Sequence, residues 1–317
     1  MAANVSPDYP MWSALLRWSL KQQDGTSREA PSAMSAEDRA FLEAALKDAT
    51  VDEGQRLGEV LQLVASEDES SEAALRELEE TVERLDLARD ICKMGGMKVV
   101  LAAAARGSVA ACGVVATAAQ NDAPAQEAIA ADGGLTTLVA AFQKFGDDED
   151  FRRSALSATS ALVRGNADLE KQFLQLGTGG YLLASALNGG SPRLAAKAAF
   201  FLYALLYEAE PARVEDLEPA LRALLPRATE PLPSSSSEDN HTAIWQLRES
   251  ATNAIVRASK ANSSWVKRNL GVPIQQAAKH IRATASSSDA DHDAHRLADL
   301  IALWRDIDWL DDDLSSV

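Results

Sequence analysis

The chain has 317 residues and a formal charge of −16 at pH 7. This acidity argues against general nucleic-acid binding and against binding to anionic membranes. Hydrophobic residues make up 46% of the chain but aromatic ones only 5%, and Ala and Leu dominate, which favours a large core of closely packed helices and disfavours sheets.

The N-terminal residues predict a segment that is separate from the rest of the chain. Met11–Gln23 is amphipathic, and Asp24–Ser35 is small, polar and proline-bearing, as in a flexible tether. Ser35 then opens a capping box for a helix over Asp38–Lys47. Two interpretations of the amphipathic segment stay open: a helix docked on the first repeat, or a detachable apolar peptide. We assign residues 1–35 to this segment and residues 36–70 to a helical N-terminal cap.

Residues 71–283 predict a set of helical repeats. In Phe151–Leu187, apolar residues recur at the spacing of one helix face, Gly165-Asn166 breaks the first helix, and Gly179-Gly180 precedes the third. The glycine pairs recur about 38–46 residues apart, the period of armadillo and HEAT repeats. We therefore expect an all-α fold, a right-handed superhelical armadillo (HEAT-like) solenoid. The other copies occupy Glu72–Ala105, with Gly95-Gly96, Ala111–Phe142, with Gly133-Gly134, a stretch from Leu194, and Leu247–Ile281.

The C-terminal part predicts two loops and a final helix. Thr229–Asn240 is rich in proline and serine and is expected to be a loop between repeats, and Thr284–Asp293 a second one. The helix over Ala294–Leu310 would close the stack, as solenoids require. Residues 284–317 are thus an acidic loop and a capping helix.

Residue patterns for catalysis or metal binding are weak. The histidines near the C-terminus lie in a Ser/Asp-rich loop with no scaffold for a metal, and no serine sits in a nucleophile elbow. Cys92 and Cys112 lie in apolar helical contexts, which predicts buried free thiols in a reducing compartment. No secretory signal or membrane-spanning run is visible. We expect no enzyme, no cofactor, no metal and a cytoplasmic location.

The third helix of each repeat is expected to line a groove. With Ala155, Leu156, Thr159 and Leu162 buried, helix geometry turns the other face of the central helix towards the groove. The register leaves no Trp/Asn ladder of the kind that armadillo import receptors carry: Gly113, Ser157, Phe200 and Asn253 stand at the Trp positions, and Thr117, Ala161, Ala204 and Arg257 at the Asn positions. Small residues would let a folded partner approach closely. The resulting groove positions are Arg153, Ser157, Ala161 and Arg164, then Gly113, Thr117 and Gln120 in the repeat before, and Lys197, Phe200, Ala204, Asn253 and Arg257 in the repeats after.

The groove is also expected to be basic. Phe151–Phe200 contains six Lys or Arg residues and two acidic ones, a net +4, which leaves −20 for the remainder. A basic groove on an acidic body would steer an acidic protein partner, although several of these side chains could instead only solvate helix surfaces.

The chain resembles the armadillo-type nucleotide exchange factors of heat-shock protein 70. The resemblance rests on ALSATSALVRGNADLEKQFLQLGTGG (155–180), AACGVVATAAQN (110–121), PRLAAKAAFFLYALL (192–206) and the N-terminal LLRWSL (15–20), in that family's order. It extends over most of Met11–Ile281, more weakly before Ser70 and after Pro226.

This resemblance implies a co-chaperone that holds one lobe of the chaperone's ATPase domain in the groove, opens its nucleotide cleft and releases ADP. Lys197 and Phe200 match groove positions of the family, flanked by Gln120, Asn121, Arg153, Arg164 and Arg257. In this family the N-terminal segment competes for the chaperone's peptide-binding domain and hastens client release. The resemblance implies that its apolar anchors here are Trp12, Leu15, Leu16 and Trp18. We expect a monomer. The alternative is an armadillo adaptor for another partner, such as a ubiquitin-ligase or cytoskeletal scaffold.

Overall fold

The computed structural model describes residues 36, 39–40, 53–176, 179–230, 238–287 and 291–310. Within these ranges the chain is helical apart from short connections, and no strand occurs, which confirms the all-helical prediction. The chain divides into two compact units, Met1–Glu59 and Val60–Val317, and the repeats lie in the second. The helices are α3 (Glu53–Ala65), α4 (Glu69–Thr81), α5 (Leu85–Lys93), α6 (Gly96–Ala105), α7 (Val109–Ala118), α8 (Ala123–Ala131), α9 (Gly134–Lys144), α10 (Glu149–Val163), α11 (Ala167–Gln175), α12 (Gly179–Asn188), α13 (Pro192–Leu205), α14 (Pro211–Asp216), α15 (Glu218–Ala228), α16 (Glu238–Ala261), α17 (Ser263–Ser287) and α18 (Asp291–Trp304).

The central repeat is the predicted helical triplet. Helices α10, α11 and α12 occupy the three pieces expected in Phe151–Leu187, and Gly165 between the first two has a left-handed backbone with φ 76°. All the apolar positions named for α10 are buried, including Leu156, Thr159 and Leu162. Buried phenylalanines join successive triplets, because Phe173 of α11 lies 5.2 Å from Phe201 of α13 between ring centroids.

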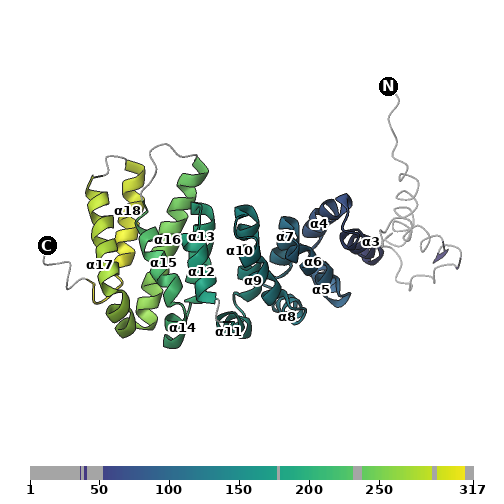
Figure 1. Cartoon of the computed structure of the whole chain (residues 1–317), viewed down its shortest axis with the longest axis horizontal. Helices are drawn as coiled ribbons and strands as arrows, with labels where there is room; N and C mark the ends of the chain where they lie inside the picture. Colours follow the sequence, from purple (N-terminus) through teal and green to yellow (C-terminus); the bar gives the residue numbers. More distant parts are fainter. Residues whose placement is uncertain are drawn as a thin grey trace, which may run out of the picture. The chain divides into compact units, whose positions relative to one another are not determined.

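The long helices of successive repeats stack on one another (Figure 1). Helix α4 packs on α7, α7 on α10, α10 on α13, and α13 on α16. Parallel rows run beside this one, since α5 packs on α8, α6 on α9, and α12 on α15. No triplet can bury its apolar faces alone, so the core is shared along the stack.

The glycine pairs act where a helix must start close against the preceding one. Gly133, at the N-cap of α9, has φ 84°, which glycine adopts without the steric cost that a side chain would bring. At Gly134 a Cβ atom would lie only 2.7 Å from the carbonyl oxygen of Ile129. The first glycine therefore turns the chain, and the second lets α9 approach the end of α8.

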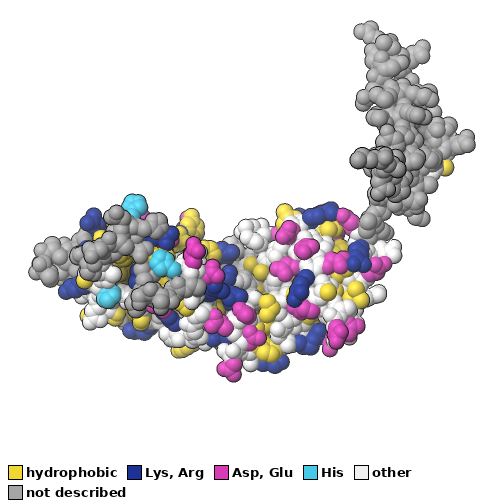
Figure 2. Space-filling model, turned by 90° about the horizontal axis from the view of Figure 1, so that it is seen from above, with side chains coloured by type: hydrophobic (Ala, Val, Ile, Leu, Met, Phe, Trp, Pro, Cys, Tyr) yellow, Lys and Arg dark blue, Asp and Glu magenta, His cyan; other side chains and the backbone are white. Residues whose placement is uncertain are grey.

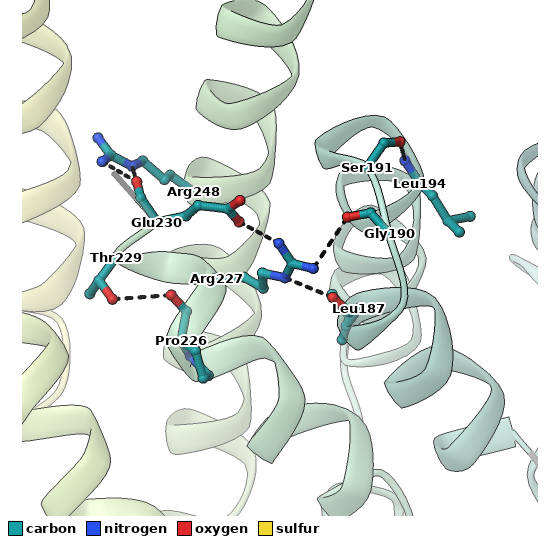
Figure 3. A network of polar contacts seen from close by, with 9 residues as sticks. All are labelled: Leu187, Gly190, Ser191, Leu194, Pro226, Arg227, Thr229, Glu230 and Arg248. Atoms are coloured by element: carbon teal, nitrogen blue, oxygen red, sulfur yellow. Dashed lines mark hydrogen bonds and ion pairs between the residues drawn. The ribbon is translucent and has the colours of Figure 1, made fainter. Parts of the chain in front are cut away.

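Polar side chains tie neighbouring repeats together at helix ends. Figure 3 shows Arg227 of α15 reaching the end of α12, where its Nε donates to the Leu187 carbonyl at 2.7 Å. The same guanidinium pairs with Glu230 at 2.7 Å and donates to the Gly190 carbonyl at 3.4 Å. The backbone carbonyl of Glu230 in turn accepts from Arg248 of α16. Carbonyls left unpaired at the end of α12 thus gain donors from the next repeat.

The C-terminal loops are shorter than expected. Helix α17 continues to Ser287 and α18 starts at Asp291, so most of the expected loop Thr284–Asp293 is helical. Helix α16 likewise starts at Glu238, inside the expected loop Thr229–Asn240. The boundary expected at residue 71 falls within α4. Because serine and aspartate are favoured in first helical turns and at caps, Ser/Asp-rich stretches resemble loops in sequence.

The last helix, α18, packs on the preceding helices and differs in extent from the expected helix Ala294–Leu310. Leu297, Leu300 and Trp304 of α18 are buried, and α18 packs on α16 and α17. The chain from Arg305 to Leu310 forms turns rather than the expected helix, with Ile307 and Trp309 also buried. The expected N-terminal tether and nearly all of the expected helix over Asp38–Lys47 lie outside the described residues.

Candidate functional site: a pocket on the groove helices

A pocket of about 940 Å³ lies along four stacked helices, α7, α10, α13 and α16, which we call the groove helices. Helices α10, α13 and α16 each contribute residues spaced three or four positions apart, which is the spacing of one helix face, and the end of α7 contributes Ala116, with Gln120 just beyond it. The pocket is therefore built by the stacking of repeats rather than by any single one.

The α13 wall of the pocket carries Arg193, Lys197, Phe200 and Tyr203. Ser191 starts this helix, its hydroxyl accepting from the Leu194 backbone N–H at 3.4 Å, and Pro192 follows in the first turn. The opposite face, with Leu194, Ala198 and Phe201, is buried. Burial of that face turns the Lys197 and Phe200 side chains into the pocket.

The α10 wall carries Arg153, Ser157 and Arg164. Arg164 is the C-cap of α10, and the last turn of this helix is held by Gln126 of α8. The buried Gln126 amide donates to the carbonyls of Ala161 and Arg164 at 2.8 and 3.1 Å. The Arg164 guanidinium carbon lies 5.0 Å from the centroid of the Phe200 ring, so the two walls meet in a cation–π contact.

Two of the four cations in the pocket have carboxylate partners, and two have none within the described part of the chain. Arg153 pairs with the exposed Asp150, and Arg193 with Asp239, each at 2.8 Å. Lys197 and Arg164 make no ion pair with any described residue, and the Arg164 side chain donates only a long hydrogen bond to the Ser160 carbonyl, 3.3 Å.

The pKa values of these two side chains are both lowered. Partial burial lowers the pKa of the Lys197 ammonium, and the positive charges of Arg153 and Arg164 lower it further. Partial burial also lowers the pKa of the Arg164 guanidinium. The lowered pKa values reflect like charges and partial burial, which a bound anion would offset.

The α16 wall has the opposite sign. Asp239 and Glu249 line it together with Thr242, Gln246, Ser250 and Asn253. Glu249 is exposed and makes no ion pair among the described residues. Figure 2 shows dark blue and magenta side chains side by side near the middle of the described part of the face it presents. The groove is thus basic on α10 and α13 and acidic on α16, where the sequence suggested a basic groove.

The structure brings most of the expected site residues together. Those that line the pocket are Gln120, Arg153, Ser157, Ala161, Arg164, Lys197, Phe200 and Asn253. Asn121 does not line it, because it follows the end of α7 in a left-handed turn with φ 57°. Arg257 does not line it either. Its guanidinium is stacked on the Tyr203 ring at 3.6 Å and donates to the Tyr203 hydroxyl at 2.7 Å, so it supports a pocket residue from behind.

The sequence reasoning missed other pocket residues. Arg193 and Tyr203 lie four positions before Lys197 and three after Phe200, so the same helical register could have identified them. Asp239 lies in the stretch Thr229–Asn240, which resembles a loop in sequence, so the register did not reach it. Glu249 lies four positions before Asn253 in the expected repeat Leu247–Ile281, so the same helical register could have identified it. Gly113 was expected to leave room for a partner. Instead, a Cβ atom there would lie 2.4 Å from the Glu79 carboxylate of α4, which occupies that space.

The remaining expected site residues cannot be placed. Trp12, Leu15, Leu16 and Trp18 lie outside the described residues. Among the described residues, no group of three or more His, Cys, Asp or Glu side chains could hold a metal ion. None of the helices in this part of the chain is long and apolar enough to cross a membrane.

Comparison with known families identifies the N-terminal part of the chain. Residues 13–91 match the family described as "Nucleotide exchange factor Fes1", which confirms the resemblance to this class of exchange factor. The matched segment ends within α5, so the groove helices lie beyond it. No curated protein matches the chain.

Comparison with solved structures identifies the fold. A designed armadillo repeat protein is 18% identical, with a TM-score of 0.58 over 78% of this chain and 99% of its own. A second one, solved with the peptide (KR)4, is 16% identical, with a TM-score of 0.60 and the same coverage. An engineered protein reaches 0.63 at 16% identity, over 80% of this chain and 99% of its own. The protein is therefore an armadillo-type helical solenoid, and its residues 13–91 are similar to an exchange-factor family.

Proposed function

We propose that this protein is a non-catalytic nucleotide exchange factor for heat-shock protein 70, and that the groove helices bind the chaperone's ATPase domain. The observation that carries the proposal is the Fes1-family match over residues 13–91, directly before an armadillo-type stack. The gathering of Lys197, Phe200 and Arg164 in one pocket supports the groove as the binding site. Outer or buried positions for these three side chains would have counted against it.

The size and chemistry of the pocket favour a folded protein as the partner. Its polar walls and its single exposed aromatic ring suit a protein surface better than a small apolar ligand. The cations on α10 and α13 would oppose a basic peptide such as the one bound by the designed relative.

The exchange step follows from preferential binding rather than from chemistry on the nucleotide. If the groove binds the ATPase domain in its open form more tightly than in its closed form, complex formation shifts the chaperone towards the open form. Equal affinity for both forms would shift nothing, and an extensive shift requires a preference of about 10⁴-fold. ADP then leaves through the opened cleft. In this proposal the protein works as a monomer in the cytoplasm.

Release of a fluorescent ADP analogue from the chaperone, followed by stopped-flow, tests the proposal. Micromolar exchange factor should accelerate release severalfold or more, and a rate equal to that without the protein would refute it. A pull-down from cell extract separates the adaptor alternative. Under our proposal the chaperone dominates the bound fraction, whereas a scaffold for another pathway would retain other proteins.

A further inference from the structure

Uncompensated basic and acidic side chains stand on opposite walls of the pocket. The cationic side chains that lack a carboxylate partner, Lys197 and Arg164, stand on α13 and at the end of α10. The uncompensated carboxylate, Glu249, stands on α16 at the other wall. The described chain pairs the other two cations internally, so these three groups remain available to a bound molecule.

Arg164, one of the two uncompensated cations, is held in place before any partner arrives. The Arg164 backbone carbonyl accepts from Gln126, and its guanidinium rests on the Phe200 ring. Lys197 lies one helical turn before Phe200 on α13, whose opposite face is buried. Preorganised charges of like sign gain more from a bound anion than mobile ones, because less ordering accompanies binding.

We propose that the pocket recognises a charge-polarised surface on its protein partner: a carboxylate side chain docks against Lys197 and Arg164 beside the Phe200 ring, and a neighbouring basic side chain faces Glu249. This two-point contact fixes the direction in which the partner lies across α13 and α16. Net charge alone would attract a partner without orienting it. The inference rests on the proposed function for the identity of the partner, the ATPase domain, but not for the polarity of the pocket.

A charge swap that leaves the net charge unchanged tests the polarity. The double variant Lys197→Glu/Glu249→Lys reverses the two walls. The matched control, Lys171→Glu/Glu127→Lys, makes the same exchange at exposed positions on α11 and α8, outside the pocket. All proteins are full-length, and circular dichroism checks that their helicity is unchanged. Calorimetric titration against the chaperone's ATPase domain is done at low and at physiological salt.

We expect the pocket swap to raise Kd at least about tenfold, and the control swap to change it less than about twofold. The Kd of the wild type should also rise more steeply with salt than the Kd of the pocket swap, because the swap has lost the attractive charge pairs that salt screens. Similar affinities for the two swaps, with ADP release still accelerated by the wild type, would overturn the inference and leave the proposed function standing.

A second probe decides the inference if the wild type does not bind the ATPase domain. Two labelled peptides of the same composition are compared by fluorescence polarisation, one with a glutamate block followed by a lysine block, the other with alternating charges. A polarised pocket should prefer the block peptide at least about threefold, and Lys197→Glu should abolish the preference. Equal binding of both peptides to the wild type would refute the polarity of the site.

Discussion

Arg164 at the end of α10 and Phe200 in the middle of α13 lie in contact, with the guanidinium carbon 5.0 Å from the ring centroid. This contact joins two repeats across the floor of the pocket, where a cation–π interaction is worth about 0.5–1 kcal/mol when exposed. Phe200 remains 44% exposed and lines the pocket, so part of its ring is available to a bound partner.

Phe200 and Phe201 are adjacent in sequence and face opposite ways, which separates binding from stability. Phe201 is fully buried against Phe173, so Phe201→Ala should lower the free energy of unfolding by about 3–5 kcal/mol. Phe200→Ala should lower it by less than about 1 kcal/mol but weaken binding of the ATPase domain severalfold, with helicity intact. Urea unfolding and calorimetric titration measure the two effects. Equal losses of stability would contradict the orientation of α13.

The sequence predicted the repeats because their signals are local. Helical periodicity, the break at Gly165-Asn166 and the glycine pairs each act within a few residues, and α10, α11 and α12 appear where these signals place them. The same periodicity placed eight of the twelve groove positions expected from the register in one pocket, since residues on one helix face share a direction.

The remaining features depend on contacts between distant residues. Nothing local to Gly113 shows that Glu79 fills its space, and nothing local to Arg257 shows that its guanidinium turns back onto Tyr203, 54 positions away. The start of α16 reads as a loop because acidic and polar residues are as common in first helical turns as in loops. Asp239 was missed for this reason, whereas Glu249, four positions before Asn253, could have been identified from the helical register.

Arg227 and Arg222 share helix α15 but differ in what they hold. Arg227 is 18% exposed and donates to carbonyls at the end of α12, so Arg227→Ala leaves acceptors unpaired and should cost about 1–3 kcal/mol of stability. Arg222 makes an exposed i,i+4 pair with Glu218, and Arg222→Ala should cost less than about 0.5 kcal/mol. Thermal unfolding of both variants measures the difference. A larger loss for Arg222→Ala would contradict the bridging role of Arg227.

The two cysteines should react slowly with thiol reagents in the folded protein. Burial raises the pKa of the Cys92 thiol to about 11 and that of Cys112 to about 12. At pH 8 the thiolate of Cys92 should therefore be roughly a hundredfold scarcer than at the ordinary pKa of 9.0, and alkylation should be slower by a similar factor. Rates in native buffer and in urea give the comparison, with Cys92→Ser isolating Cys112. Equal rates in both solvents would contradict the burial.

The same thiols give the stability a dependence on alkaline pH. Because their pKa values are raised in the folded state, the protonated thiols favour that state, and the contribution is complete below pH 9. It should be lost as pH rises from about 9 towards 11–12. The double variant Cys92→Ser/Cys112→Ser should show a smaller loss of unfolding free energy over this range than the wild type. An identical loss would assign the alkaline instability to other groups.

Removal of Met1–Pro31 should separate the proposed exchange activity from the client release that the family resemblance implies for the N-terminal segment. None of the helices α3–α18 includes a removed residue, so the groove helices and their pocket should fold unchanged. The truncated protein is expected to accelerate ADP release as the full chain does. Release of a labelled client peptide from the chaperone should be slower with the truncated protein than with the full chain. A full-length variant with Trp12, Leu15, Leu16 and Trp18 replaced by serine is the matched control, and it should reproduce the client-release defect. Impaired ADP release in both proteins would contradict this expectation. It would mean that the groove helices alone do not accelerate ADP release and that the N-terminal segment takes part in the exchange step.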